Sequence, residues 1–200
     1  MPDPPGGDTT ARSYTARLIR LQLRGWKRLL DVQAPYRWNL RTLLGERRVL
    51  DVGCGIGRNL SHLSVGSVGV DHNEYSVGVC RARGLTAYLP DEFAAQQHAA
   101  PFEGLLAAHL LEHLPAGQAA EVLRGYLPYL QPGARVVLIC PQERGFASDA
   151  THTVFLDDDA LHQVCAELGL ALQWQSSFPF PRWMGRLFTY NEFVTVAACP

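Results

Sequence analysis

The sequence predicts one α/β domain with a mostly parallel sheet, and three observations lead to this prediction. Short apolar strands alternate with helices from residue 48 onward, the order that produces a parallel sheet covered by helices. A cluster of glycines directly follows the first strand, as in folds that bind ligands at the carboxyl ends of their strands. The composition, 47% hydrophobic and 18% charged over 200 residues, is typical of one globular domain.

The expected elements follow one another in a regular order along the chain. From apolar runs, strands are expected at residues 48–52, 67–71, 85–89, 105–111, 135–140, 171–175 and 192–197. From helical periodicity and turn signals, helices are expected from the glycine cluster to residue 63 and over 75–83, 91–100, 117–130 and 157–168. The acidic run at 157–159 suits the positive end of the last helix.

Residues 1–34 form a separate N-terminal segment in this interpretation, and residues 35–200 form the domain itself. Residues 1–10 are rich in Pro, Gly and Asp and predict a mobile tail. Residues 12–32 predict an amphipathic helix that ends before Pro35, with an apolar face and an arginine-rich face. This helix is expected to cover the functional site as a lid, with docking on an anionic surface or simple core packing as alternatives.

Charge and cysteine patterns exclude several classes of protein. Residues 1–48 carry ten Lys or Arg against four Asp or Glu, whereas the remainder carries eight against fifteen. The acidic body makes nucleic acid an unexpected partner. The five cysteines are scattered without a CxxC pair, which fits a reducing, cytoplasmic location and no disulfide framework. There is no run of 18 apolar residues and no apolar signal core near the N-terminus.

The glycine cluster lies in the segment VLDVGCGIGR, residues 49–58. Gly53, Gly55 and Gly57 lack Cβ atoms and allow a tight turn with backbone close to a ligand. Asp71 ends the next strand, 20 residues after Asp51. A carboxylate there is placed to accept hydrogen bonds from the two hydroxyls of a ribose; the alternative role for Asp71 is capping the following helix.

Two details distinguish this loop from a dinucleotide site. The glycine spacing is GxGxG, so the third glycine of GxGxxG is missing. Asp51 sits at the end of the strand, where a carboxylate suits a cationic or amino-bearing ligand and repels a pyrophosphate. Both details argue against a nucleotide-dependent oxidoreductase, which remains the alternative enzyme class.

Four motifs, in order, resemble those of the class I methyltransferases that use S-adenosyl-L-methionine (SAM). They are VLDVGCGIGRNL, GVDHN, FEGLLAAHLLEHL and LQPGARVVLICP, within residues 49–141. The resemblance implies a Rossmann-like, mostly parallel seven-stranded sheet with its last strand antiparallel and helices on both faces. It implies SAM as the cofactor, with an acidic residue near the adenine that is Asp91 or Glu92. The cofactor-binding residues that it implies are Asp51, Gly53, Cys54, Gly55, Gly57, Asp71, His72, Asp91 and His109.

Three histidines are candidate catalytic residues because of what the resemblance implies. In this fold the end of the fourth strand faces the acceptor, so His109 and His113 are placed to contact or deprotonate it. His152 lies in a loop after the fifth strand that borders the same side. The alternative for each is a hydrogen bond to loop backbone. The segment from His109 to His113 also matches the HxxEH zinc motif, but no metal is expected because the motif runs off a strand and not along a helix.

The sequence therefore predicts a methyltransferase that acts on the oxygen or nitrogen of a small-molecule acceptor. The absence of an NPPY-type motif and of an added nucleic-acid module supports that acceptor class. Residues 177–186, with two prolines and three aromatic residues, are expected to wall the acceptor pocket or to form an ordinary packed connection. A SAM-binding protein without catalysis remains the alternative function.

Overall fold

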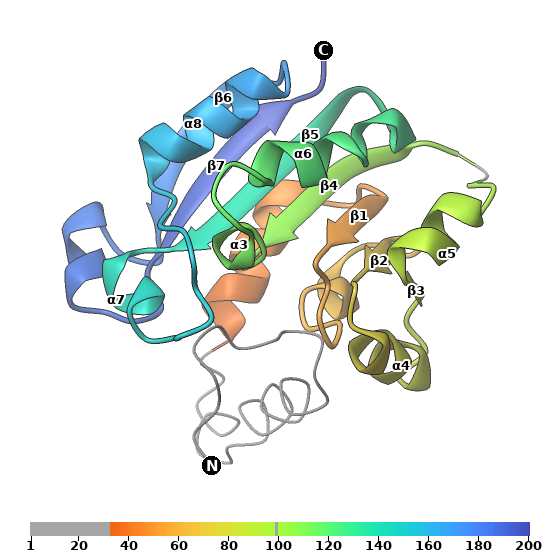
Figure 1. Ribbon diagram of the computed structural model, residues 1–200, viewed down its shortest axis with the longest axis horizontal. Helices are drawn as coiled ribbons and strands as arrows, with labels where there is room; N and C mark the ends of the chain where they lie inside the picture. The colour runs from red at the N-terminus through yellow and green to blue at the C-terminus, as the bar shows by residue number, and fades with distance from the viewer. Residues whose placement is uncertain (1–32, 99) are drawn as a thin grey trace. The chain divides into compact units, whose positions relative to one another are not determined.

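The computed structural model describes residues 33–98 and 100–200. The described residues divide into an N-terminal unit, residues 33–98, and a C-terminal unit, residues 100–200. The strands belong to one seven-stranded sheet in the order β3-β2-β1-β4-β5-β7-β6. Strand β7 runs antiparallel to β5 and β6. The predicted mostly parallel α/β sheet with its last strand antiparallel is confirmed (Figure 1).

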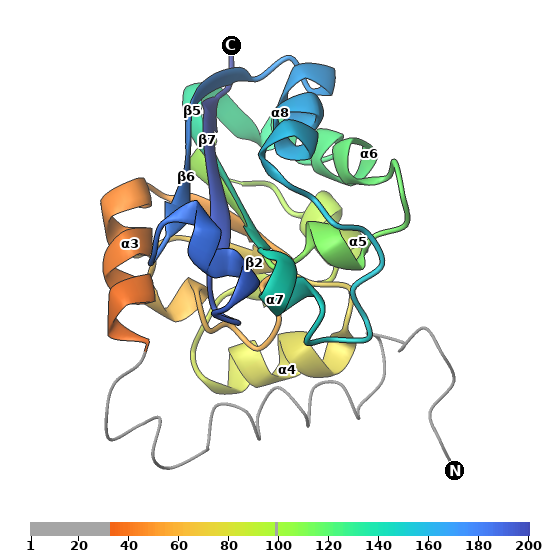
Figure 2. The ribbon, with the colours of Figure 1, turned by 90° about the vertical axis from the view of Figure 1, so that its left-hand side faces the viewer.

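The N-terminal unit places its glycine loop between two parallel strands. Its elements are α3 (Ala34–Leu44), β1 (Val49–Val52), β2 (Val68–Val70), α4 (Glu74–Ala82), β3 (Ala87–Tyr88) and α5 (Pro90–Ala95). Asp51 of β1 lies opposite Gly69 of β2, and Val70 lies opposite Tyr88 of β3. In Figure 2, α3 lies to the left of β2 and α5 to its right, so helices cover both faces of these strands.

The C-terminal unit is built on four long strands. Its strands and α-helices are β4 (Phe102–Ala108), α6 (Ala119–Arg124), β5 (Leu130–Pro141), α7 (Glu143–Phe146), α8 (Asp158–Glu167), β6 (Ala171–Phe178) and β7 (Glu192–Ala198). Helix α8 packs on β6, β7 and α6, and Figure 2 shows α6 and α8 side by side. Near-continuous burial of β4, β5 and β7 is the pattern of central strands covered on both faces.

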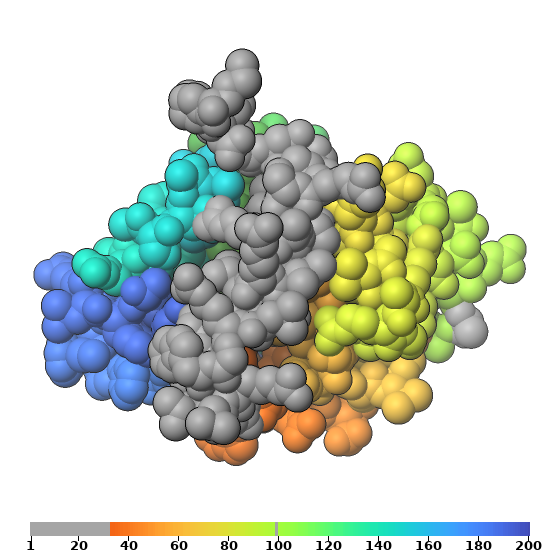
Figure 3. All heavy atoms as spheres, turned by 90° about the horizontal axis from the view of Figure 1, so that it is seen from below, coloured from red at the N-terminus to blue at the C-terminus, as the bar shows by residue number. Residues whose placement is uncertain are grey.

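A short 3-10 helix, Arg182–Arg186, packs against α7. The two guanidinium nitrogens of Arg182 lie 2.7 and 2.8 Å from the two carboxylate oxygens of Glu143. Figure 3 shows the two segments side by side on one face of the C-terminal unit. This two-pronged ion pair fixes the connection between β6 and β7 at the end of β5.

Several predicted boundaries are wrong for physical reasons. Helix α3 was not expected; it begins at Ala34, and Pro35 lies in its first turn, where its missing N–H is not needed. The predicted helix after the glycine loop is only a 3-10 turn, Leu60–His62. The predicted helix at 117–130 stops at Arg124 and is followed by a 3-10 turn, Leu127–Tyr129, that contains Pro128. The predicted helix over residues 12–32 lies outside the described residues.

The fourth strand is shifted relative to its prediction. It covers Phe102–Ala108 and not 105–111, because His109 has a φ of +57° and turns the chain out of the sheet. A 3-10 turn, Leu111–His113, follows. Left-handed backbone is unfavourable for a residue with a Cβ atom, so the surrounding contacts must hold His109 in this conformation.

Among the helices of the described residues, none combines the length and the apolar character that a membrane-spanning segment requires.

Candidate functional site

The glycine loop of the N-terminal unit depends on left-handed backbone at each of its three glycines. Gly53, Gly55 and Gly57 have φ values of 75°, 53° and 76°. The amide of Gly53 donates to the carbonyl of Val70 over 2.8 Å, which joins the loop to the end of β2. Glycine adopts these angles without the steric penalty of a Cβ atom. The loop therefore has the shape that the sequence predicted.

Asp71 is held by the backbone of this loop and of the turn after β2. Its Oδ2 accepts a hydrogen bond of 2.8 Å from the amide of Gly55, and its Oδ1 accepts one of 2.8 Å from the amide of Asn73. Each oxygen of a carboxylate has a second lone pair, so acceptor capacity remains for a diol. The cap of α4 is Asn73, which accepts from the amides of Tyr75 and Ser76. The alternative capping role for Asp71 is therefore not what the structure shows.

Asp51 is a buried carboxylate beside the loop. It is 1% exposed, and within the described residues its Oδ2 has no hydrogen-bond partner. Burial, followed by the negative charge of Asp71, raises its pKa to about 7, although the amide of Leu60 and the charge of Arg58 oppose the shift. An unpaired buried carboxylate is unfavourable unless a cation or donor approaches it. SAM carries an ammonium and a sulfonium, so these residues fit that cofactor.

The other predicted cofactor residues divide into two groups. Cys54 is 7% exposed and packs in a cluster with Leu60 and Cys80, so its side chain is part of the hydrophobic core beneath the loop. A Cβ atom on Gly69 would lie 2.6 Å from the Cys54 sulfur, which shows how tightly that space is filled. A contact between Cys54 and the cofactor would therefore involve its backbone, and it stays a prediction.

His72 and Asp91 lie at the surface of the N-terminal unit. His72 is half exposed, and its Nδ1 lies 3.9 Å from Oδ1 of Asp71. Asp91 is exposed in the first turn of α5. Glu92, the alternative acid, accepts from the amide of Leu89 over 2.9 Å and pairs with Arg81. Of the two acids, Asp91 is the better candidate for a contact with adenine.

Gly57 gives a stability prediction for the loop. A Cβ atom at Gly57 would lie 2.5 Å from Cδ1 of Leu85 and 2.9 Å from Sγ of Cys80. Overpacking and left-handed strain should together lower the free energy of unfolding of Gly57→Ala by about 2–5 kcal/mol. Chemical denaturation measures this loss. Gly84→Ala is the matched control, because Gly84 has the same φ of 76° but no atom within 4 Å of its Cβ position; equal losses in the two variants would contradict the packing argument.

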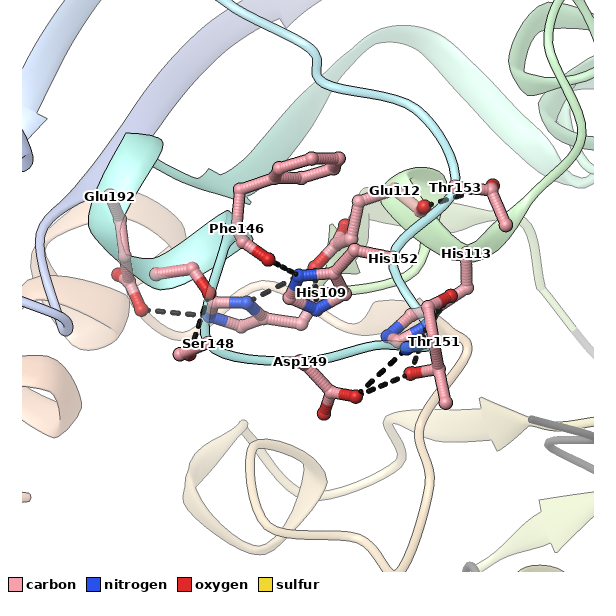
Figure 4. Close-up of polar contacts among 11 residues, drawn as sticks. His109, Glu112, His113, Phe146, Ser148, Asp149, Thr151, His152, Thr153 and Glu192 are labelled. Atoms are coloured by element: carbon pink, nitrogen blue, oxygen red, sulfur yellow. Dashed lines mark hydrogen bonds and ion pairs between the residues drawn. The ribbon is translucent and has the colours of Figure 1, made fainter. Parts of the chain in front are cut away.

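A second cluster of polar side chains lies in the C-terminal unit and is centred on His109 and Glu112 (Figure 4). Nε2 of His109 lies 2.8 Å from Oε1 of Glu192, and its Nδ1 lies 3.3 Å from Oε1 of Glu112. Burial by itself lowers the pKa of His109, but the bonds to the two carboxylates outweigh burial and raise it to about 10. Because the side chain is 31% exposed, the effect of burial is incomplete, and the two carboxylates determine the direction of the pKa shift.

Glu112 is fully buried in this cluster. Neither of its carboxylate oxygens makes a hydrogen bond of normal geometry to the described residues. Burial raises its pKa, but the effect of His109 is in the opposite direction and the net pKa is lowered. Its backbone carbonyl accepts from the amide of Thr153 over 2.7 Å, which fixes the loop after α7 to the turn after β4.

His113 and His152 complete the cluster. Nδ1 of His113 lies 3.2 Å from the carbonyl oxygen of Thr151, and Nδ1 of His152 lies 2.8 Å from the carbonyl oxygen of Phe146. The ring centroids are 4.8 Å apart. Asp149 accepts from the amide and the hydroxyl of Thr151 and shapes the loop. Burial lowers the pKa of His113. The structure thus brings the three predicted histidines into one cluster.

Sequence reasoning missed the two carboxylates that organise these histidines. Glu112 was noted only as part of a motif, and Glu192 is 83 residues away from His109. Antiparallel pairing of β5 with β7 places Glu192 opposite Pro141, at the end of β5. An acidic residue at the start of the last strand is the signal that sequence analysis had available.

The segment at 177–186 is joined to the core by polar contacts. The side-chain amide of Asn191 donates to Oε1 of Gln142 and to Oγ of Ser177, each over 2.9 Å. Gln142 is fully buried, and a Cβ atom on Gly185 would collide with it at 1.9 Å. These contacts favour the alternative of a packed connection between β6 and β7.

Comparison with known proteins establishes the family. A family model described as a methyltransferase domain matches residues 19–189. The chain belongs to the class I SAM-dependent methyltransferases, and its cofactor is SAM. No curated protein sequence matches the chain significantly.

Solved structures share the fold at low sequence identity. A SAM-dependent methyltransferase from Archaeoglobus fulgidus has 21% identity and a TM-score of 0.68, with 92% of this chain and 99% of that chain covered. Magnesium protoporphyrin IX methyltransferase from Synechocystis PCC 6803, with bound SAH, has 14% identity and a TM-score of 0.67, covering 96% and 97%. A putative methyltransferase in complex with its Trm112 activator from Haloferax volcanii has 17% identity and a TM-score of 0.68, covering 94% and 95%.

Proposed function

We propose that this methyltransferase transfers the methyl group of SAM to an oxygen or nitrogen of a small-molecule acceptor. The observation that carries the proposal is the pair of carboxylates at the glycine loop. Asp71 keeps acceptor capacity for the ribose hydroxyls, and Oδ2 of buried Asp51 has no partner among the described residues and could pair with a cationic group. The cofactor supplies the reactive methyl group, and the protein supplies position and a dry site.

The C-terminal unit supplies the residues that act on the acceptor in this proposal. His109 is a positioning residue, because carboxylates engage its two ring nitrogens and neither nitrogen is left to take a proton. His113 and His152 each have Nδ1 within hydrogen-bond distance of a main-chain carbonyl, so in each neutral ring the lone pair is on Nε2. These two histidines are therefore the proposed catalytic residues.

The charge distribution supports a small acceptor over a nucleic acid. Beyond residue 48 the chain has eight basic against fifteen acidic residues, a net charge of −7 that disfavours contact with phosphate backbones. One structural neighbour is named as an enzyme acting on magnesium protoporphyrin IX. The predicted helix at 12–32 lies outside the described residues, so its role as a lid, or its docking on an anionic surface, stays part of the proposal together with a cytoplasmic location.

Methyl-labelled SAM tests the acceptor class directly. The purified protein is incubated with labelled SAM and, separately, with the small-molecule, RNA and protein fractions of a cell extract. We expect label to enter the small-molecule fraction and to be absent when the Asp71→Asn variant replaces the wild type. Label in the RNA or protein fraction alone would reject a small-molecule acceptor, and cofactor binding without label transfer to any fraction would favour the non-catalytic alternative.

A further inference from the structure

We propose that Glu112, His113 and His152 bind a divalent first-row transition metal ion. Glu112 and His113 belong to the 3-10 turn after β4, and His152 belongs to the loop after α7. One ligand atom from each residue lies within 4.8 Å of the others. Figure 4 shows the three side chains gathered between these two segments. Two imidazoles and one carboxylate are ligands that such ions favour.

The carboxylate of Glu112 is the first independent reason for a cation at this position. It is fully buried, and neither oxygen makes a hydrogen bond of normal geometry to the described residues. The ring nitrogens nearest to it are Nδ1 of His109 at 3.3 Å and Nε2 of His152 at 4.0 Å. A buried carboxylate in a native protein is normally paired, hydrogen-bonded or bound to a metal. A metal ion would give this buried carboxylate a second cationic partner beside His109.

The orientation of the two histidines is the second reason. In each ring, Nδ1 is within hydrogen-bond distance of a main-chain carbonyl, that of Thr151 for His113 and that of Phe146 for His152. A carbonyl accepts only from a protonated Nδ1, so the lone pair of each neutral ring is on Nε2. Metal-binding histidines typically donate their other ring N–H to a carbonyl or carboxylate in this way. The contacts therefore prepare both rings as neutral ligands.

Between Glu112 and His152 the spacing requires only a small contraction around an ion. With metal–ligand bonds of about 2.0–2.2 Å, neighbouring ligand atoms lie roughly 3.0–3.4 Å apart. Nε2 of His152 and Oε1 of Glu112 are 4.0 Å apart, so a movement of less than about 1 Å brings them into range. His109 retains its 2.8 Å contact with Glu192 when the ion takes over Glu112.

Three protein ligands leave coordination positions open, which gives the site a role in the proposed function. With the ion in place, His113 and His152 act on the acceptor through the ion and not as bases. An acceptor hydroxyl bound to the ion would lose its proton to solvent, since a bound cation lowers the pKa of a coordinated oxygen. The oxygen lone pair would then form the new C–O bond while the C–S bond breaks and its electron pair returns to sulfur. This step rests on the proposed function and assigns the acceptor to the hydroxyl class.

The earlier expectation of no metal considered only His109 and His113 on a helix. Those two residues do not form the set, because His109 is held between Glu192 and Glu112. The third ligand comes from His152, 39 residues after His113 along the sequence. The new assignment therefore uses a different group of atoms from the HxxEH motif.

Cobalt titration tests the site without reference to methyl transfer. The full chain is treated with chelator and titrated with Co²⁺, whose visible d–d absorption reports coordination by protein ligands, with Zn²⁺ as competitor in calorimetry. We expect one equivalent to bind with micromolar affinity or better. Glu112→Gln and His152→Gln should each weaken binding by at least about 100-fold, more than the 10–100-fold typical of outer-shell partners. His162→Gln, an exposed histidine on α8, is the matched control and should bind as the wild type does.

The outcomes separate this proposal from the proposed function. Circular dichroism shows whether each variant is folded. If Glu112→Gln does not fold, His152→Gln is the variant that tests the site. Absence of Co²⁺ absorption in the wild type, or unchanged affinity in a folded Glu112 or His152 variant, would overturn the metal site while SAM binding in the same samples stands. Metal binding without methyl transfer to any acceptor fraction would support the site and reject the proposed function.

Discussion

Replacing Asp71 with Asn is expected to weaken SAM binding by about 100-fold. We propose that the carboxylate accepts two ribose hydroxyls, and a hydrogen bond to a charged group contributes about 1.5–3 kcal/mol, where 1.4 kcal/mol is a factor of ten. In addition, each oxygen of Asp71 already accepts a backbone amide, from Gly55 or Asn73. The Asn side chain would place an NH2 donor against one of these amides, so the loop itself loses a contact.

Calorimetric titration with SAM measures this loss, and the control variant is Asp159→Asn. Asp159 is an exposed acid in the first turn of α8, so the control makes the same chemical change away from the loop. Circular dichroism confirms that the Asp71 variant is folded at the temperature of the titration. Wild-type affinity in Asp71→Asn would show that the ribose is held elsewhere and would remove the central assumption about the cofactor site.

The positions of the strands along the sequence were predictable because their side chains are nearly all apolar. Residues 49–52 and 136–140 are buried runs, and buried strands keep that signature whatever their neighbours are. Boundaries were less predictable where an apolar run continues beyond its strand. Leu110 and Leu111 extend the run after β4, yet His109 has already turned the chain away. Composition alone does not report that turn.

The glycine loop was more predictable than the histidine cluster. Gly53, Gly55 and Gly57 lie close together in sequence, and a single strand-to-helix spacing places Asp71 beside them. The histidine cluster depends on contacts between distant segments. Glu192 reaches His109 only through the antiparallel pairing of β7 with β5, and His152 reaches Glu112 only through the loop that Asp149 shapes. No local pattern encodes either contact.

Asp51 gives the second large effect, a dependence of SAM affinity on pH. Its pKa in the protein is raised to about 7, first by burial and then by Asp71. A neutral Asp51 cannot pair with the ammonium or sulfonium of SAM, so binding must release the proton. We therefore expect the affinity to rise roughly tenfold per pH unit below about pH 7 and to level off above it.

The stability of the unliganded protein should change with pH in the opposite direction. The folded-state pKa lies above the value of 3.8 for an ordinary Asp, so the folded state binds the proton more tightly than the unfolded chain does. Raising the pH from about 4 to about 7 therefore removes stability, and saturating SAM should raise the melting temperature most at the upper end of this range. Asp51→Asn, which stays neutral, should show neither trend beyond the titration of SAM itself. An affinity for SAM that does not vary between pH 5 and pH 8 in the wild type would mean that Asp51 does not contact the charged groups of the cofactor.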